Sequence, residues 1–375
     1  METIFWLCLF LVAYPYAIYP AALVLFNRLS RRRLHVGGST FEPSISVILP
    51  VHNEARRVEE KVRNLLALEY PRRKLQVLVI GDGCTDDSLA RAVGAGDGSV
   101  KAIPLAQRQG KAAALNAGLE QATGEIVVFT DAGIMLEPHS LRRLVAHFSD
   151  ERVACVSGED YIEGADSEGL YGRLELLLRR EEAKLHSIAG ASGCFYAQRR
   201  SVCRPFIAGM APDFLSVLVT VASGKRALSE PGARGFMTAT LSQRAEFHRK
   251  VRTFLRGITA LFGNASLLNP FAFPAFSFVL WSHKLMRWMA PVPMVGCLLS
   301  SFLLRTEPLY AFAFVLQIGL YALAVAGLVW PFLSRFTLVR LSAFFLLVNV
   351  AAMQALLLWI GGHRVEVWQP TQRPT

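Results

Sequence analysis

Residues 46–88 read SVILPVHNEARRVEEKVRNLLALEYPRRKLQVLVIGDGCTDDS, and this stretch decides the fold. Two short apolar runs, Ile45–Leu49 (ended by Pro50) and Val77–Ile80, have the β-branched composition of buried strands. Between them, Glu54–Leu68 places apolar residues at helical spacing. A strand, a helix and a second strand in this order predict a parallel pair joined by a crossover helix.

The same alternation continues along the chain. Thr85 is a candidate cap for the helix that follows it. We expect further helices at Asp86–Val93, Lys111–Gln121 and Leu141–Phe148, and further strands at Ile126–Thr130 and Val153–Ser157. The central part of the chain is therefore predicted to be an α/β domain with a mixed, mostly parallel sheet.

Polar side chains follow three of the predicted strands. His52, Asn53 and Glu54 follow the first strand, Asp82 the second, and Asp131 the strand that ends at Thr130. Each could be a turn or cap residue, but ligands of parallel sheets bind beyond the carboxyl ends of the strands. A carboxylate there accepts hydrogen bonds from a base or ribose, or holds Mg²⁺ or Mn²⁺ against a diphosphate.

Two phosphate-binding motifs are missing from the sequence. Neither a G-x-x-x-x-G-K-[ST] loop nor a G-x-G-x-x-G fingerprint occurs, which excludes a P-loop ATPase and disfavours a dinucleotide site. Candidate cations for a diphosphate are Arg108, Lys111, Arg249 and Arg252.

The composition predicts a membrane protein. Hydrophobic residues make up 53% and charged residues only 18%, against about 25% charged in soluble proteins. The apolar run Ile4–Phe26 is long enough to span a bilayer, and basic residues follow it instead of preceding it, which argues against a signal peptide. Further spans are expected near 287–304, 308–333 and 341–360, and charge placement predicts four spans with both termini outside.

Many of the basic residues that give the net charge of +11 lie next to these apolar segments. Arg28, Arg31, Arg32 and Arg33 follow the first span, which favours lipid headgroups over nucleic acid as the partner. The stretch 244–262 has the pattern of a basic amphipathic helix in the interface plane, or alternatively of a surface helix on the soluble domain. The six cysteines show no zinc spacing and are expected to be free thiols.

The ordered set of motifs resembles one known family, the membrane-bound family 2 glycosyltransferases of the polysaccharide- and cellulose-synthase-like branch. Besides residues 46–88, the likeness rests on RQGKAAALNAGLEQATGEIVVFTDAGIMLEP (108–138), GCFYAQRR (193–200), APDFLSVLVTVASGKRALSEPGA (211–233), RKVRTFLRG (249–257), LLNP (267–270) and SHKLMRWMAP (282–291).

The resemblance implies a GT-A fold and inverting transfer from a nucleotide-diphospho-sugar, commonly a UDP-sugar. It implies substrate binding by Glu54, Asp82, Lys111, Asp131, Arg249 and Arg252, and with the residues near the strand ends and the candidate cations the predicted substrate-binding set also includes Pro50, His52, Asn53 and Arg108. Glu54 and Asp82 would contact the uracil and ribose. Asp131 would hold Mg²⁺ or Mn²⁺ as the first acid of a DxD motif, and Asp213 would be the general base.

The sequence departs from the family pattern in the same motifs. The DxD reads Asp131-Ala132-Gly133, so its second acid is absent. The segment Arg249–Thr253 lacks the tryptophan of a Gln-x-x-Arg-Trp motif, which weakens the case for channel-forming polymer synthesis. Asp213 could instead cap a helix, and the two arginines could bind lipid phosphate.

These observations predict an integral protein of the plasma (inner) membrane with four parts. They are an anchor and basic linker (1–40), a cytoplasmic GT-A domain (41–242), interfacial helices (243–288), and terminal spans with a tail (289–375). The expected activity is sugar transfer to a lipid-linked or glycan acceptor in cell-surface polysaccharide or glycolipid synthesis. The alternatives are a polyprenyl-phosphate glycosyltransferase and a non-catalytic nucleotide-binding partner of an export complex. A transporter is disfavoured because the spans hold almost no ionisable residues.

Overall fold

One mixed β-sheet forms the centre of the molecule. The computed structural model describes residues 1–31, 41–163, 166–238 and 243–364. Within these ranges, eight strands pair in the order β3-β2-β1-β4-β7-β6-β8-β5. They are β1 (Ile45–Val51), β2 (Leu75–Asp82), β3 (Val100–Leu105), β4 (Ile126–Thr130), β5 (Met135–Leu136), β6 (Val153–Glu163), β7 (Phe195–Arg199) and β8 (Arg226–Thr238). The predicted α/β class with a mixed, mostly parallel sheet is confirmed.

The first four strands form the parallel half of this sheet. β1 pairs in parallel with β2 and β4, and β2 in parallel with β3. β7 then runs antiparallel to both β4 and β6. This register brings the carboxyl ends of β1, β2 and β4 to one edge, as the alternating pattern predicted.

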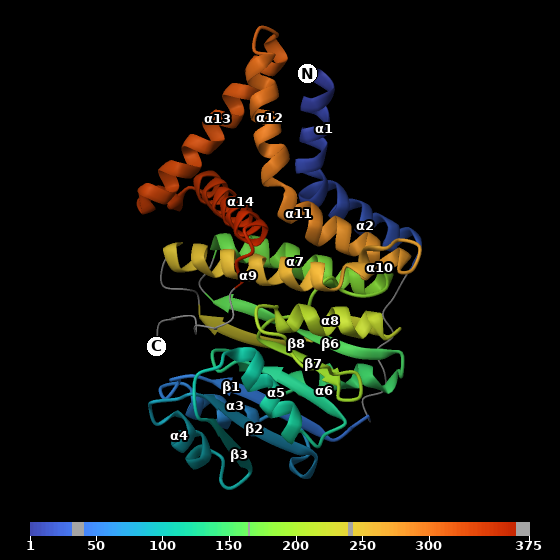
Figure 1. The fold of residues 1–375 in the computed structure, drawn as a ribbon, viewed down its shortest axis with the longest axis vertical. Coiled ribbons are helices and arrows are strands. Elements are labelled where there is room, and N and C mark those ends of the chain that lie inside the picture. Colours follow the sequence, from blue (N-terminus) through green and yellow to red (C-terminus); the bar gives the residue numbers. More distant parts are fainter. Residues whose placement is uncertain (32–40, 164–165, 239–242, 365–375) are drawn as a thin grey trace.

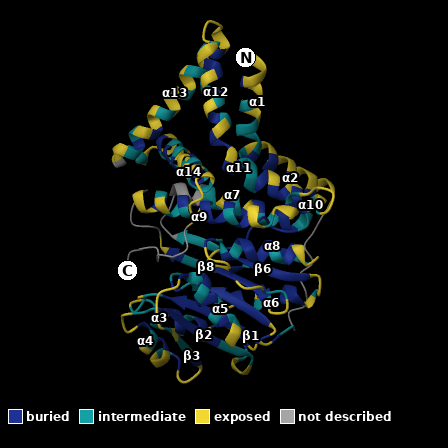
Figure 2. Ribbon diagram, in the orientation of Figure 1, coloured by how far each residue is buried: buried dark blue, intermediate teal, exposed yellow. Residues whose placement is uncertain are grey.

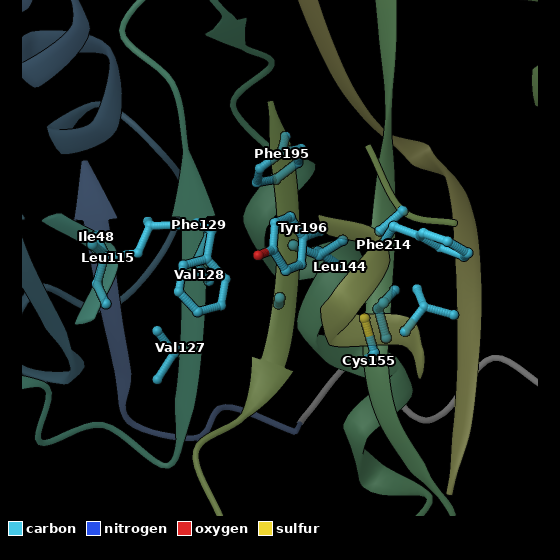
Figure 3. Packing of buried hydrophobic residues seen from close by; sticks show 14 of the residues in the cluster. Ile48, Leu115, Val127, Val128, Phe129, Leu144, Cys155, Phe195, Tyr196 and Phe214 are labelled. Atoms are coloured by element: carbon cyan, nitrogen blue, oxygen red, sulfur yellow. The ribbon is translucent and has the colours of Figure 1, made fainter. Parts of the chain in front are cut away.

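Side chains from both faces of the parallel strands are buried. All seven residues of β1 are buried, as expected for a sheet covered on both sides. Ile48, Leu115, Val128 and Phe129 belong to one core cluster, and Phe129 stacks on Tyr196 of β7 with ring centroids 4.8 Å apart (Figure 3). The domain helices are α3 (Val58–Leu66), α4 (Ser88–Ala95), α5 (Lys111–Gln121), α6 (Ser140–Ala146) and α8 (Pro212–Ala222).

Some predicted boundaries were wrong. β1 continues through Pro50 to Val51 instead of ending at Pro50, and α3 begins only at Val58. Thr85 is not the cap of α4: the N-cap residue is Asp87. The Thr85 backbone N–H donates to Asn53 Oδ1 instead, at 2.9 Å.

A layer of helices separates the sheet from the apolar helices (Figure 1). It contains α7 (Asp166–Leu185), α9 (Gln243–Gly263), α10 (Pro274–Val279), the π-helical segment η5 (Leu280–Leu285) and α11 (Met286–Met289). We call it the interfacial layer. α9 is the predicted amphipathic helix, and it packs on α8 and on α14, so it contacts both the α/β domain and an apolar helix.

Three helices in the described residues are long and apolar enough to cross a membrane. They are the continuous helix Glu2–Leu29, α13 (Pro308–Val329) and α14 (Thr337–Ile360). A fourth crossing is possible if the pair Pro274–Met289 and Pro291–Leu303, bent by 55°, forms one broken span. Their outward surfaces are largely exposed (Figure 2).

The first of these helices contains a π-helical turn, Tyr14–Ile18, which includes Pro15 and ends two residues before Pro20. Arg32 and Arg33 of the basic cluster, and the predicted tail beyond 364, lie outside the described residues. The number and direction of membrane crossings stay predictions.

Candidate active site

Two adjoining hollows lie beyond the ends of β1 and β4. The smaller, of about 10 Å³, is lined by Pro50, Lys111, Leu115, Phe129, Thr130, Asp131, Gly193, Tyr196, Pro212 and Asp213. The larger, of about 180 Å³, is lined by Glu54, Arg57, Asp131, Ala132, Gly133, Gly193, Cys194, Met237, Arg249, Arg252, Thr253 and Arg256. Asp131 and Gly193 line both, so the two hollows form one candidate site.

Asp131 is held where β4 ends. Its backbone N–H donates to the carbonyl oxygen of Cys194 at 3.1 Å. Its Oδ1 lies 2.6 Å from the amine of Lys111, which also donates to the carbonyl oxygen of Gly193 at 3.2 Å. Lys111 is the first residue of α5 and follows Gly110, whose φ of 93° is favoured by glycine. The structure therefore joins two residues that are 20 positions apart in the sequence.

Asp213 lies in the first turn of α8. This helix begins at Pro212, and its N-cap residue is Ala211, with no side-chain capping bond. The alternative that Asp213 is the N-cap is therefore wrong. A Cβ on Gly193 would lie 3.8 Å from the carboxyl carbon of Asp213, so the absence of a side chain at Gly193 leaves space in front of the carboxylate.

Four arginines line the larger hollow: Arg57, Arg249, Arg252 and Arg256. Arg249 donates to both carboxylate oxygens of Glu246, each at 2.7 Å. Arg256 donates to the carbonyl oxygen of Met210 at 2.8 Å, and its Nε is buried without a hydrogen-bond partner among the described residues.

The electrostatic environment of Arg252 and Arg256 ties them to this site. Burial lowers the pKa of Arg252, and the like charge of Arg249 lowers it further. Burial lowers the pKa of Arg256 as well, while the charge of Asp213 acts in the opposite direction. An anion bound between these arginines would be stabilised by their positive charge.

Sequence reasoning missed Arg57 and Arg256. The signal for Arg256 was present, because Arg249, Arg252 and Arg256 follow one another at i, i+3 and i+7 and so share a helix face. Arg57 lies in the turn before α3, within a segment that had been predicted as helix.

The other predicted residues line neither hollow. Asp82 is buried, and its carboxylate accepts from the backbone N–H groups of Gln109 and Gly110 at 2.7–3.1 Å. His52 Nδ1 lies 2.6 Å from the carbonyl oxygen of Asp82. Asp82 therefore holds the loop that leads into Lys111.

Asn53 and Arg108 lie in exposed loops near this point. Asn53 has a φ of 53°, and its side chain bonds Thr85. Gly83, with a φ of 58°, has no room for a Cβ, which would lie 2.4 Å from the backbone nitrogen of Arg108. The two loops after β2 and β3 thus pack closely together beside the site.

Lys61 was also missed. It is fully buried in α3, and its amine donates to the carbonyl oxygen of Ile134 at 2.6 Å, below the turn that carries Asp131. Burial lowers the pKa of Lys61 to about 7, against the effect of the Asp131 charge. In sequence, Lys61 looks like one more charged residue on a helix surface.

The side chains at this site could hold a divalent cation through a single carboxylate. Among the described residues, no three His, Cys, Asp or Glu side chains gather at one point. Asp131 offers one carboxylate, and Mg²⁺ is often held by one or two carboxylates plus substrate phosphates and water. Asp131 would thus hold the metal, whose charge would offset that of a bound diphosphate.

Comparisons with known proteins agree with this arrangement. Residues 46–205 match the family described as Glycosyl transferase family 2. The fold is similar to that of a solved structure, the mannosyltransferase PcManGT from Pyrobaculum calidifontis in complex with GDP-Man and Mn²⁺. The TM-score is 0.70 at 23% identity, over 93% of this chain and 99% of the other. That similarity extends over the apolar helices and establishes the GT-A fold.

Curated relatives match part of the chain. Glycosyltransferase AglE of Haloferax volcanii is 28% identical over 161 residues, covering 42% of this chain and 53% of the relative. The undecaprenyl-phosphate 4-deoxy-4-formamido-L-arabinose transferase of Pseudomonas syringae is 33% identical over 105 residues, 27% of this chain and 31% of the relative. The chain thus spans about half of the first and a third of the second. Residues 46–205 match glycosyl transferase family 2, and the chain carries the GT-A fold, as its motifs predicted.

Proposed function

We propose that this protein is a membrane-anchored inverting glycosyltransferase. It moves a sugar from a nucleotide-diphospho-sugar to a lipid-linked or glycan acceptor in cell-surface polysaccharide or glycolipid synthesis. One observation carries the proposal: Asp213 and the Lys111–Asp131 pair line one small pocket, and four arginines line the hollow next to it.

The residues divide into an acceptor side and a donor side. Inverting transfer needs a base for the acceptor hydroxyl and positive charge for the departing diphosphate. In this proposal, Asp213 takes the proton from the acceptor. Lys111, Arg252 and Arg256 stabilise the diphosphate as its negative charge grows.

The donor nucleotide and the acceptor form the finer part of the proposal. The family resemblance predicts UDP, whereas the mannosyltransferase with the same fold is in complex with GDP-Man, so both nucleotides belong in the test. Transfer to polyprenyl phosphate is the second candidate, and the undecaprenyl-phosphate transferases among the relatives support it. That acceptor is already an anion and would not need Asp213 as a base.

We also propose a location at the plasma (inner) membrane with the site on the cytoplasmic side; the helices long enough to span a bilayer support the membrane part of this proposal. The interfacial layer lies between the sheet and the apolar helices, so the site lies close to the expected headgroup plane (Figure 1). We also propose the four-part division at 1–40, 41–242, 243–288 and 289–375. In this scheme the interfacial helices connect the catalytic domain to the bilayer.

The test uses membranes that contain the full-length chain. They are incubated with labelled UDP- and GDP-sugars and Mg²⁺ or Mn²⁺, and lipid-bound product is separated from polymer. We expect metal-dependent transfer that is lost in Asp213→Asn, with normal expression and nucleotide binding. Full transfer by Asp213→Asn would remove Asp213 as the base and favour a phosphate acceptor. Nucleotide binding without transfer by the wild type would favour the non-catalytic alternative.

A further inference from the structure

A loop of small residues connects the candidate active site with the interfacial layer. Residues 190–194, Gly-Ala-Ser-Gly-Cys, precede β7. At the active-site end, the carbonyl oxygen of Gly193 accepts from Lys111, and Gly193 lies against Asp213. What lies at the other end of this loop is not explained by donor binding.

At that other end, the amine of Lys284 lies against Gly190. A Cβ on Gly190 would be 3.4 Å from Nζ of Lys284 and 3.7 Å from Cδ2 of Phe214. Nζ lies 5.8 Å from the centre of the Phe214 ring, and Phe214 directly follows Asp213. Because three residues span at most about 10 Å, the amine and the proposed base lie at opposite ends of one short segment.

The carboxylates nearest to Lys284 already have other partners. Glu175 pairs with His283 and Arg287. Glu182 accepts from the hydroxyl of Tyr19 at 3.0 Å and from the backbone N–H of Ala189 at 2.9 Å, and it lies 2.7 Å from Nδ1 of His283. In addition, no carboxylate of the described residues lies within 4.0 Å of the Lys284 amine.

A second cation reaches the same end of the loop. Arg179 of α7 donates to the carbonyl oxygen of Ala191 over a long 3.4 Å, and its Nη1 lies 3.7 Å from Oδ1 of Asp160. Nη1 of Arg179 and Oδ1 of Asp160 are both buried without a hydrogen-bond partner among the described residues. Arg179 and Lys284 repel each other electrostatically. A shared anion would stabilise these two like charges beside one loop and would accept from the unsatisfied Nη1 of Arg179.

We propose that Lys284 and Arg179 bind the phosphate of a lipid-linked acceptor. Lys284 lies in η5, inside the first helix of the bent apolar pair (Pro274–Met289), so an anion bound there can keep its hydrocarbon chain in the membrane. The proposal rests on the proposed function and names its acceptor class. The phosphate can be a lipid monophosphate or the diphosphate that links a lipid to a sugar, and the test separates the two.

The experiment measures binding without any donor, using the full-length chain in phosphatidylcholine nanodiscs. Farnesyl phosphate, farnesyl diphosphate, farnesol and inorganic phosphate are titrated, and quenching of tryptophan fluorescence is followed. Trp288 packs on Phe214 with ring centroids 6.2 Å apart and so lies near the proposed site. We expect one of the two farnesyl anions to bind at least tenfold more tightly than farnesol and inorganic phosphate, which identifies the phosphate form.

The variants are Lys284→Met, Arg179→Gln and the conservative Lys284→Arg. Arg173→Gln is the control, because Arg173 lies on the same helix as Arg179 but is exposed. We expect Lys284→Met and Arg179→Gln to weaken farnesyl anion binding at least tenfold, with little loss in Lys284→Arg and none in Arg173→Gln. Equal binding by Lys284→Met and wild type, or equal affinity for farnesol, would overturn the proposal.

A negative result in the binding test can be distinguished from a negative result in the transfer test. Absence of sugar transfer from any donor would contradict the proposed function while leaving the measured anion affinity unchanged. Inorganic phosphate that binds as tightly as farnesyl phosphate would show a site for a free anion and would reject the lipid acceptor.

Discussion

The amine of Lys111 lies 2.6 Å from Oδ1 of Asp131, with only 12% and 25% of the two side chains exposed. The pair joins the start of α5 to the end of β4. In the proposed reaction, Lys111 shields the bound diphosphate from Asp131 and adds positive charge. Any ligand that enters this pocket meets both charges at once.

Replacing Lys111 tests this pairing. Lys111→Met leaves Asp131 without its partner and removes one cation from the proposed leaving-group side. We expect kcat to fall about 10²–10³-fold, the effect of removing one donor from a charge-stabilising site. Initial rates of sugar transfer measure it. Lys101→Met is the control, since Lys101 is exposed on β3, and an equal loss there would contradict the assignment.

Arg252 is the second test. Arg252→Ala removes a guanidinium from the lining of the larger hollow without breaking a hydrogen bond that the structure records. We expect KM for the donor to rise about 10–100-fold, as for losing a charge-assisted hydrogen bond of about 1.5–3 kcal/mol. Thermal stability should not change. Arg244→Ala, at an exposed position on the same helix, should leave KM unaltered. If both variants behave alike, the arginines serve the lipid surface instead.

Lys61 predicts a distinctive pH dependence. Its pKa in the folded protein is about 7, below the ordinary value of 10.5, so the unfolded chain binds more protons between these values. The stability of the wild type should therefore gain a contribution that increases from pH 7 to 10. Thermal unfolding in detergent at pH 7, 8.5 and 10 measures it.

Lys61→Met should lose this contribution, since it carries no titrating amine. Sugar transfer by Lys61→Met should also fall, because the bond to the carbonyl oxygen of Ile134 supports the turn that carries Asp131. An identical pH dependence in Lys61→Met and wild type would show that the buried amine does not titrate in this range.

Replacing Glu182 tests how strongly the catalytic domain is held to the first apolar helix. Its carboxylate is fully buried and bonds Tyr19, His283 and the backbone of Ala189. Glu182→Ala removes the acceptor for the Tyr19 hydroxyl and the Ala189 N–H and the partner of Nδ1 of His283, and we expect the free energy of unfolding to fall by about 3–5 kcal/mol. Thermal unfolding in detergent measures it, with the exposed Glu120→Ala as control. A loss of less than 1 kcal/mol would contradict a stabilising role.

The sequence predicted β1, β2 and β4 of the parallel half because these strands are short apolar runs with polar residues directly after them. β3 and β8 were not predicted, because their segments contain Pro104 and Pro231, which weaken a strand pattern. Both positions are tolerated, since β3 lies at the sheet edge and β8 is irregular where it pairs with β6.

Within the site, Asp131, Lys111 and Asp213 were found through motifs. Lys61 could not be found, because its burial depends on the turn Asp131–Ile134 folding over α3, and helical periodicity does not report such long-range contacts. The same applies to Lys284. Its neighbours Gly190 and Phe214 lie more than 60 positions away in the sequence.

The bonds of Glu182 to Tyr19 and His283 also bear on protein engineering. A water-soluble fragment made by cutting the chain at its linkers would leave Glu175 and Glu182 on a newly exposed face, without the tyrosine, histidine and arginine that contact them. Truncation alone would therefore yield a poorly folded product. A usable soluble version would need that face redesigned at the same time, because buried polar contacts join it to the helices that would be removed.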